Sequence, residues 1–213
     1  MKKNILLILI LSIAFAYIES AVVIYLRSLY YPNCFPFPLQ TFNNSHLLIE
    51  LGREVSTIII LIGLGYIVGK NFLQRFAFFM FAFGIWDIFY YIWLKLFINW
   101  PESFFAWDIL FLIPLPWLGP VLSPIIVSVC LIISSMIVIH FETQDYPIIV
   151  KTIDWVILIF AGIIIIFSYL QHFYTIINNG TPGYYSWWLF TCGLAIGALT
   201  FLNRIRAHII TRK

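Results

Sequence analysis

Ionisable side chains fall inside the apolar segments of this chain or at their edges. They are Glu19, Glu50, Arg53, Glu54, Asp87, Asp108 and His172. Hydrocarbon cannot solvate a charge, so an ionisable group at membrane depth faces protein or water and commonly marks an ion path, a metal site or a catalytic group. We therefore expect these residues to mark a functional site near one membrane face.

Helical spacing supports this convergence within single segments. His46, Glu50, Glu54 and Thr57 recur at three- and four-residue intervals, so they form one stripe on a helix. In the third apolar segment, Tyr91 follows Asp87 by one turn along the same face. Glu19 and Arg27 share a face of the first apolar segment, two turns apart. These stripes place several polar groups at one level of a helical bundle.

Carboxylate and imidazole groups are ligands for zinc, manganese or iron, and facing helices of a bundle can supply them. The candidate ligands for a divalent metal are Glu19, His46, Glu50, Glu54 and His172, and the candidate catalytic groups are Glu54, Asp87 and Asp108. The residues expected to orient the substrate are Arg27, Arg53, Tyr91 and Trp107. The guanidinium groups of the two arginines can bind a phosphate or carboxylate through bidentate hydrogen bonds. The chain has no His-Glu-x-x-His motif, so such a metal site would have an unfamiliar spacing.

The same residues also fit a structural network of ion pairs. Glu50 and Glu54 are spaced for pairing with arginine on their own or a neighbouring helix. The acids nevertheless outnumber the nearby cations, which are Arg27, Arg53 and Lys95. Buried carboxylates close together cannot all ionise cheaply, so the excess must hold a proton or a cation.

Composition defines the class of protein that holds this site. Of 213 residues, 62% are hydrophobic and 10% charged, and the mean hydropathy is +0.99, which is typical of a polytopic membrane protein. A net charge of +3 without a basic cluster argues against a nucleic-acid partner. Cys34, Cys130 and Cys192 show no metal-binding spacing and predict no disulfide framework.

We predict an all-α fold, a single membrane domain with six transmembrane helices. The predicted spans are 4–27, 47–69, 76–98, 119–140, 153–176 and 184–203, each about as long as a bilayer crossing requires. The first span also resembles a signal peptide, but its apolar character continues to Leu26, which favours a retained helix. Lysine and arginine residues concentrate on the side of the two termini, so the positive-inside rule predicts that both termini are cytoplasmic in the cell membrane.

The segment 99–118, between the third and fourth spans, has an unusual composition. It is too apolar for a solvated loop and too rich in proline for another crossing. We expect it to fold back onto the bundle and to cap a pocket, because irregular backbone is tolerated at membrane depth only against protein or a watery cavity.

These features favour a metal-dependent intramembrane enzyme that acts on a lipid, isoprenoid or quinone. A hydrophobic small molecule and membrane lipid would then be its partners. The first alternative is a cation or proton transporter that uses the same carboxylates, although the cytoplasmic halves of the spans offer few ionisable groups. The second alternative is a non-catalytic membrane assembly partner, in which the polar residues serve helix packing.

Overall fold

The computed structural model describes residues 2–30, 44–144, 148–178 and 180–210. Its helices are α1 (Lys2–Tyr30), α2 (Asn44–Val68), α3 (Phe72–Ile98), α4 (Leu122–Glu142), α5 (Thr152–Leu170), α6 (Phe173–Ile177) and α7 (Trp187–Ile210). Two strands, β1 (Trp107–Phe111) and β2 (Trp117–Pro120), lie between α3 and α4 in the chain. Most of the stretch between the first two predicted spans, including Cys34, falls outside the described residues.

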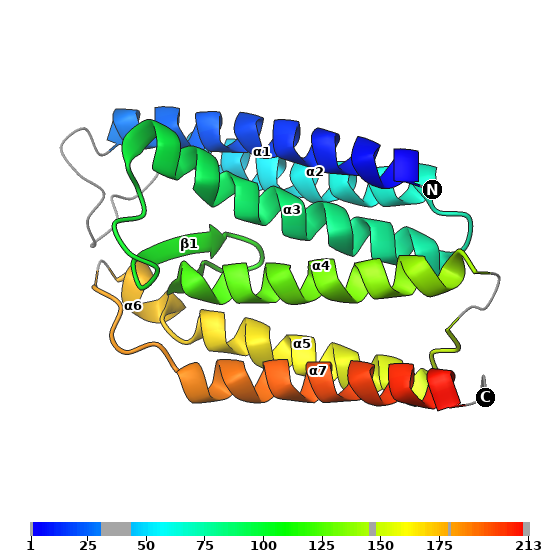
Figure 1. Cartoon of the computed structure of the whole chain (residues 1–213). Helices are drawn as coiled ribbons and strands as arrows, with labels where there is room; N and C mark the ends of the chain where they lie inside the picture. The colour runs from blue at the N-terminus through cyan, green and yellow to red at the C-terminus, as the bar shows by residue number, and fades with distance from the viewer. Residues whose placement is uncertain (1, 31–43, 145–147, 179, 211–213) are drawn as a thin grey trace.

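Long helices pack side by side, and successive ones run in opposite directions along roughly one axis (Figure 1). The start of α1 and the end of α7 lie at the same end of the molecule, which we name the termini end; β1, β2 and α6 lie toward the opposite, hairpin end. Five helical stretches are long and apolar enough to cross a membrane: Lys2–Tyr30, Phe72–Ile98, Leu122–Glu142, Thr152–Thr175 and Trp187–Ile210. The fold is therefore a helical bundle with the composition of a multi-pass membrane protein.

The second predicted span coincides with α2, which has 25 residues but is not among those five stretches. It carries Glu50, Arg53 and Glu54 in its first three turns. Its neighbour α3 begins at a clear capping signal, since the side chain of Asn71 accepts a hydrogen bond from the backbone N–H of Gln74 at 2.9 Å. Asn99 ends α3 with a left-handed backbone (φ 52°), a conformation that asparagine tolerates better than most residues.

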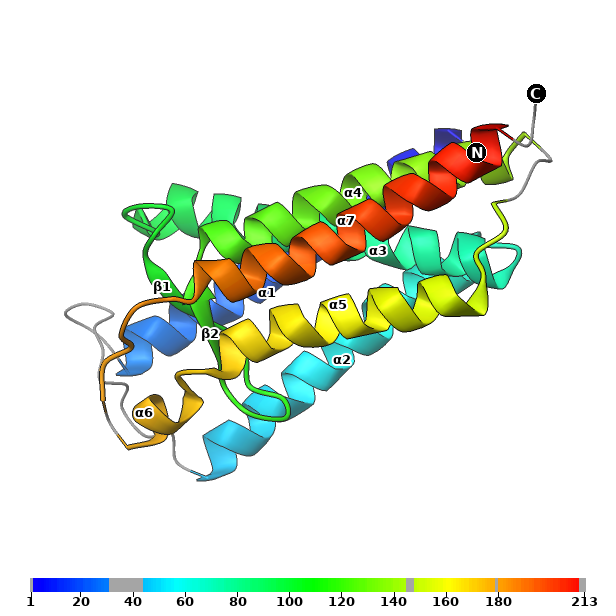
Figure 2. The same ribbon diagram turned by 90° about the horizontal axis from the view of Figure 1, so that it is seen from below.

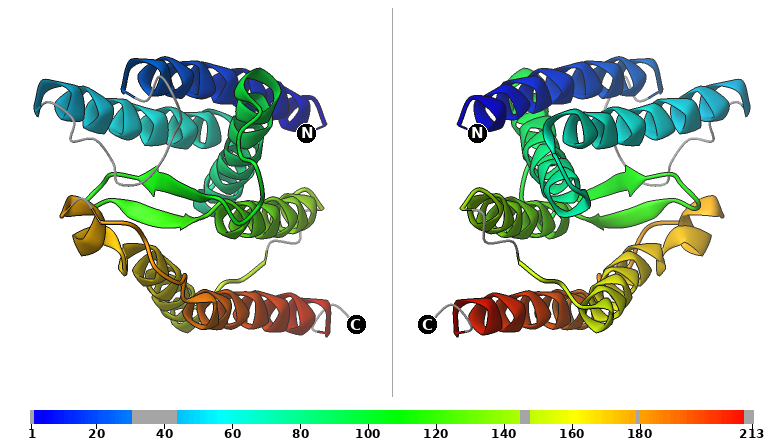
Figure 3. Two further views of the ribbon diagram at one scale, coloured as in Figure 1. Left: turned by 90° about the vertical axis from the view of Figure 1, so that its left-hand side faces the viewer. Right: turned by 90° about the vertical axis from the view of Figure 1, so that its right-hand side faces the viewer.

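The segment 99–118 does fold back onto the bundle, but as a β-hairpin. β1 and β2 pair antiparallel, with Asp108 opposite Gly119 and Ile109 opposite Leu118. The prediction of an all-α fold is therefore incomplete. The helix of the fourth predicted span begins at Leu122, three residues after the approximate start given for that span, because Gly119 and Pro120 belong to β2. Figure 3 shows the hairpin at the level of α4, between a layer formed by α1 and α2 and a layer formed by α5 and α7.

Small residues allow two pairs of helices to approach closely. A Cβ atom on Gly84 of α3 would lie 2.7 Å from the carbonyl oxygen of Ser128 in α4. A Cβ atom on Gly193 of α7 would lie 2.9 Å from the carbonyl oxygen of Ala161 in α5. Any larger side chain would push these backbones apart, which is how glycine supports tight helix packing in a membrane.

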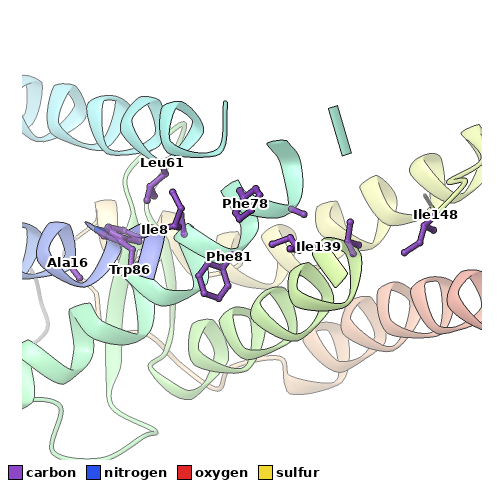
Figure 4. Close-up of a cluster of buried hydrophobic side chains, with 11 residues drawn as sticks. Ile8, Ala16, Leu61, Phe78, Phe81, Trp86, Ile139 and Ile148 are labelled. Carbon is purple, nitrogen blue, oxygen red and sulfur yellow. The ribbon is translucent and has the colours of Figure 1, made fainter. Parts of the chain in front are cut away.

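The main apolar core lies among α1, α2, α3 and α4 (Figure 4). Trp86 and Ala16 lie toward one end of this cluster in the figure, Ile139 lies nearer its middle, and Ile148 lies at the other end. At the termini end, an ion pair between Asp154 and Arg204 (2.6 Å) joins α5 to α7. A second, aromatic cluster lies at the hairpin end around the buried side chains of Tyr169, Tyr185 and Phe190.

Candidate functional site: an acidic cavity at the hairpin end

Most of the predicted site residues line one cavity of about 110 Å³, bounded by α1, α2, α3 and the hairpin. The predicted residues in its wall are Glu19, Arg27, Glu50, Arg53, Glu54, Asp87, Tyr91 and Asp108. Most of the remaining wall comes from Val23, Leu26, Trp86, Tyr90 and the stretch 109–112. Residues from distant parts of the chain thus meet at one level of the bundle, between an apolar core and the hairpin.

Arg53 on α2 lies between two of the predicted acids. Its guanidinium forms an ion pair with Glu19 of α1 and another with Glu50 of its own helix, the latter at 2.7 Å. Thr57 donates a further hydrogen bond to Glu19 at 3.1 Å. Both carboxylates are almost completely buried, so they depend on these donors for the charge compensation that water would otherwise provide.

Asp108 connects the hairpin to α1 and α3. It is 2% exposed, pairs with Arg27 at 3.3 Å and accepts a hydrogen bond from the hydroxyl of Tyr91 at 3.1 Å. The guanidinium of Arg27 also lies 3.7 Å from the ring centroid of Trp100, a cation–π geometry. Arg27 is therefore held between an acid and an aromatic face.

Glu54 and Asp87 have a different environment, because each is held by neutral donors. Both carboxylate oxygens of Glu54 accept from the backbone N–H of Leu112 in the hairpin, at 2.9 and 3.0 Å. Asp87 accepts from the hydroxyl of Ser128 on α4 at 2.8 Å. Within the described part of the chain, neither carboxylate forms an ion pair with lysine or arginine, although Arg53 attracts Glu54 electrostatically from the same helix. The cavity wall consequently holds more carboxylates than guanidinium groups.

Three predicted site residues lie away from this cavity wall. His46 contacts Tyr30 at the first turn of α2. His172 hydrogen-bonds the carbonyl of Tyr184 at 3.1 Å and packs edge-on against Trp107, with ring centroids 5.4 Å apart. Trp107 and Asp108 are neighbours in β1, so they face opposite sides of the hairpin, and His172 is on the side away from Asp108.

Three of the five predicted metal ligands share the cavity wall, but they are not arranged as a metal site. In the ranges that the structure describes, no three His, Cys, Asp or Glu side chains are grouped so that they could hold a metal ion. Glu19 and Glu50 instead share the positive charge of Arg53, and neither His46 nor His172 lines the cavity. The residues Glu19, His46, Glu50, Glu54 and His172 thus do not fit a single metal centre.

Two of the observed partners were not predicted from the sequence. Ser128 lies in an apolar helix, where serine commonly bonds its own backbone, so its contact with Asp87 has no sequence signal. The donor to Glu54 is a backbone N–H, which any residue other than proline carries. Trp86 precedes Asp87 and Tyr90 follows it by about one helical turn, and this proximity is the sequence signal that could have placed both in the wall.

No family model, curated protein or solved structure matches this chain.

Proposed function

We propose that this chain crosses a membrane six times, with the termini end in the cytoplasm. α2 supports a sixth crossing because it presents exposed apolar side chains along its length, such as Ile49, Ile59 and Ile67. Its buried stripe is narrow, which fits a helix with lipid on most sides. Basic residues gather toward the termini end, as the positive-inside rule requires of a cytoplasmic face. They are Lys2, Lys3, Lys70, Arg75, Lys151, Arg204 and Arg206.

We further propose that the cavity is the active site of an intramembrane enzyme that uses acid–base chemistry. The observation that carries this proposal is the pair Glu54 and Asp87, two buried carboxylates held only by neutral donors in a largely apolar enclosure. A carboxyl group that forms no direct ion pair in such a place readily exchanges a proton with a bound molecule. Glu54 and Asp87 would transfer protons, while Asp108 with Arg27 would fix the hairpin over the site.

The size of the cavity indicates how a substrate would bind. Pockets that enclose a whole drug-sized ligand measure roughly 300–1,000 Å³. At about 110 Å³ this cavity holds a head group or a single ring. The remaining part of the substrate would lie between helices or in the bilayer, which supports a lipid, an isoprenoid or a quinone.

A test begins with the purified protein in nanodiscs, incubated with a total lipid extract of the source membrane. Mass spectrometry should reveal a component whose mass changes with time. Because proton transfer by a placed carboxyl group contributes about 100-fold or more, Glu54→Gln and Asp87→Asn should each lower that conversion by about this factor. Glu102→Gln, at an exposed carboxylate outside the cavity, is the matched control and should convert at the normal rate.

Other outcomes would contradict this proposal. Ion flux into proteoliposomes that requires Glu54, without conversion of any lipid, would favour a transporter. Normal conversion in both carboxyl variants would show that these groups are not the proton donors. Stoichiometric bound metal that is lost in Glu50→Gln would mean that the carboxylates rearrange to form a metal centre.

A further inference from the structure

The ion pairs that the two arginines of the cavity already form limit the kinds of head group that the cavity can accept. Arg53 is shared by Glu19 and Glu50, and Arg27 is paired with Asp108 and stacked on Trp100. A phosphate or carboxylate head group would have to displace these acids from guanidinium groups they already bind. It would also meet Glu54 and Asp87, and like charges at close range in an apolar enclosure repel strongly. The arrangement therefore disfavours an anion.

A positively charged group would be accepted for the same reason. Glu54 and Asp87 accept hydrogen bonds from neutral donors, and Arg53, which attracts Glu54 electrostatically, is already bound to Glu19 and Glu50. An ammonium placed between the hairpin and α3 would therefore supply the missing counter-charge. The aromatic side chains of Trp86, Tyr90 and Tyr91 belong to the same wall. Aromatic faces attract ammonium groups, more so when water is excluded.

The indole N–H of Trp86 independently indicates that the head group carries a hydrogen-bond acceptor. Its side chain is 5% exposed and lines the cavity, and its indole Nε1 has no hydrogen-bond partner among the residues that the structure describes. A buried N–H without an acceptor is costly, and a tryptophan in a core usually finds one. A bound molecule with an oxygen acceptor would complete this hydrogen bond.

We propose that the cavity binds amphiphiles whose head group joins a protonated amine to a neighbouring oxygen, as in a long-chain amino alcohol. This inference rests on the proposed function, since it names the substrate class of the same site. The amine would lie against Glu54 and Asp87, and the oxygen would accept from the indole of Trp86. The alkyl chain would leave the cavity past Val23 and Leu26 of α1, which line it with apolar surface.

The experiment compares four probes of similar chain length in neutral dodecyl maltoside micelles. Sphinganine carries both the amine and the oxygens, and N-acetylsphinganine keeps the oxygens but loses the charge. Stearylamine keeps the charge but lacks the oxygens, and stearyl phosphate is anionic. Binding is measured by isothermal titration calorimetry, with empty micelles subtracted and Glu102→Gln as the control variant.

We expect sphinganine to bind roughly tenfold or more tightly than N-acetylsphinganine, the usual worth of a charge-assisted hydrogen bond, and stearyl phosphate to bind most weakly. Glu54→Gln and Asp87→Asn should weaken both amines. Trp86→Phe keeps an aromatic face for the ammonium but loses the N–H donor, so it should remove the advantage of sphinganine over stearylamine and weaken stearylamine much less than sphinganine, a pattern that unfolding cannot imitate. Equal or tighter binding of N-acetylsphinganine or stearyl phosphate would overturn the inference.

The two proposals can fail separately. If the lipid extract is converted with dependence on Glu54 and Asp87 but no amine binds, the enzyme proposal stands and the head-group inference is wrong. If the amines bind as expected but no component of the extract changes, the head-group inference stands and the enzyme proposal is wrong.

Discussion

The two faces of the β-hairpin pack against different kinds of surface. One face meets charged groups, with Asp108 against Arg27 and Tyr91, and the Leu112 N–H against Glu54. The other face meets rings, with Trp107 against Tyr185 and Trp117 stacked on Tyr169 at 6.2 Å between centroids. Figure 2 shows the hairpin from the side of α5 and α7, with α2 beyond it. One short hairpin thus separates an acidic cavity from an aromatic core.

These faces should respond differently to mutation. The aromatic face is stabilised by the apolar surface area that it buries. It should therefore tolerate substitutions that preserve side-chain volume and lose stability with those that leave a void. A charged face depends on matched partners, so removing one group leaves another buried without compensation. The predictions below test this difference from the largest expected effect to the smallest.

Phe190→Ala should cause the largest loss, on the aromatic side. Phe190 is fully buried and contacts Tyr169, Tyr185 and Trp187, so its truncation leaves a cavity costing about 3–5 kcal/mol in the free energy of unfolding. Unfolding in mixed micelles, followed by tryptophan fluorescence, measures the change. Phe190→Leu is the control and should lose much less; equal losses in the two variants would contradict the importance of volume here.

Arg53→Met should cost about 3 kcal/mol, near the lower end of the range for breaking a buried ion pair, because the Arg53 side chain is 21% exposed. The loss arises from Glu19 and Glu50, which remain buried without their shared cation. The same unfolding assay applies. Adding Glu19→Gln and Glu50→Gln to Arg53→Met should restore much of the stability, and a triple variant as unstable as the single one would refute the charge explanation.

Two tyrosines give a matched test with a smaller effect. Tyr91→Phe removes the donor to buried Asp108 and should cost about 2 kcal/mol, because hydrogen bonds to charged groups are the stronger kind. Tyr185→Phe on the aromatic side removes hydrogen bonds with neutral hydroxyl groups, among them that of Ser168 at 2.9 Å, and should cost about 1 kcal/mol. Thermal unfolding of both variants in the same detergent gives the comparison. A larger loss in Tyr185→Phe would reverse our ranking of the two faces.

Much of the bundle could be predicted because its signals are local. Apolar runs long enough for a bilayer predicted helices at each place where α1, α2, α3, α4, α5 and α7 occur. Helical period alone placed His46, Glu50, Glu54 and Thr57 on one stripe; the last three are buried and His46 is half-buried.

The pairing of side chains could not be predicted in the same way. The strands of the hairpin are short and surrounded by proline, so their alternation was not recognised. That alternation decides that Trp107 and Asp108 face opposite sides, and therefore that His172 is separated from the carboxylates. Likewise, the position of Arg53 between Glu19 and Glu50 depends on how α1 and α2 cross.

The sequence by itself determined the apolar spans, the level at which acids gather and the segment that folds back, because hydropathy and helical period are properties of neighbouring residues. Tertiary structure alone decided which acid receives an arginine, which binds only a neutral donor, and which residues share the cavity. The physical reason is range: an ion pair or a hydrogen bond forms only within a few ångströms, and the sequence does not specify distances between separate helices at that scale.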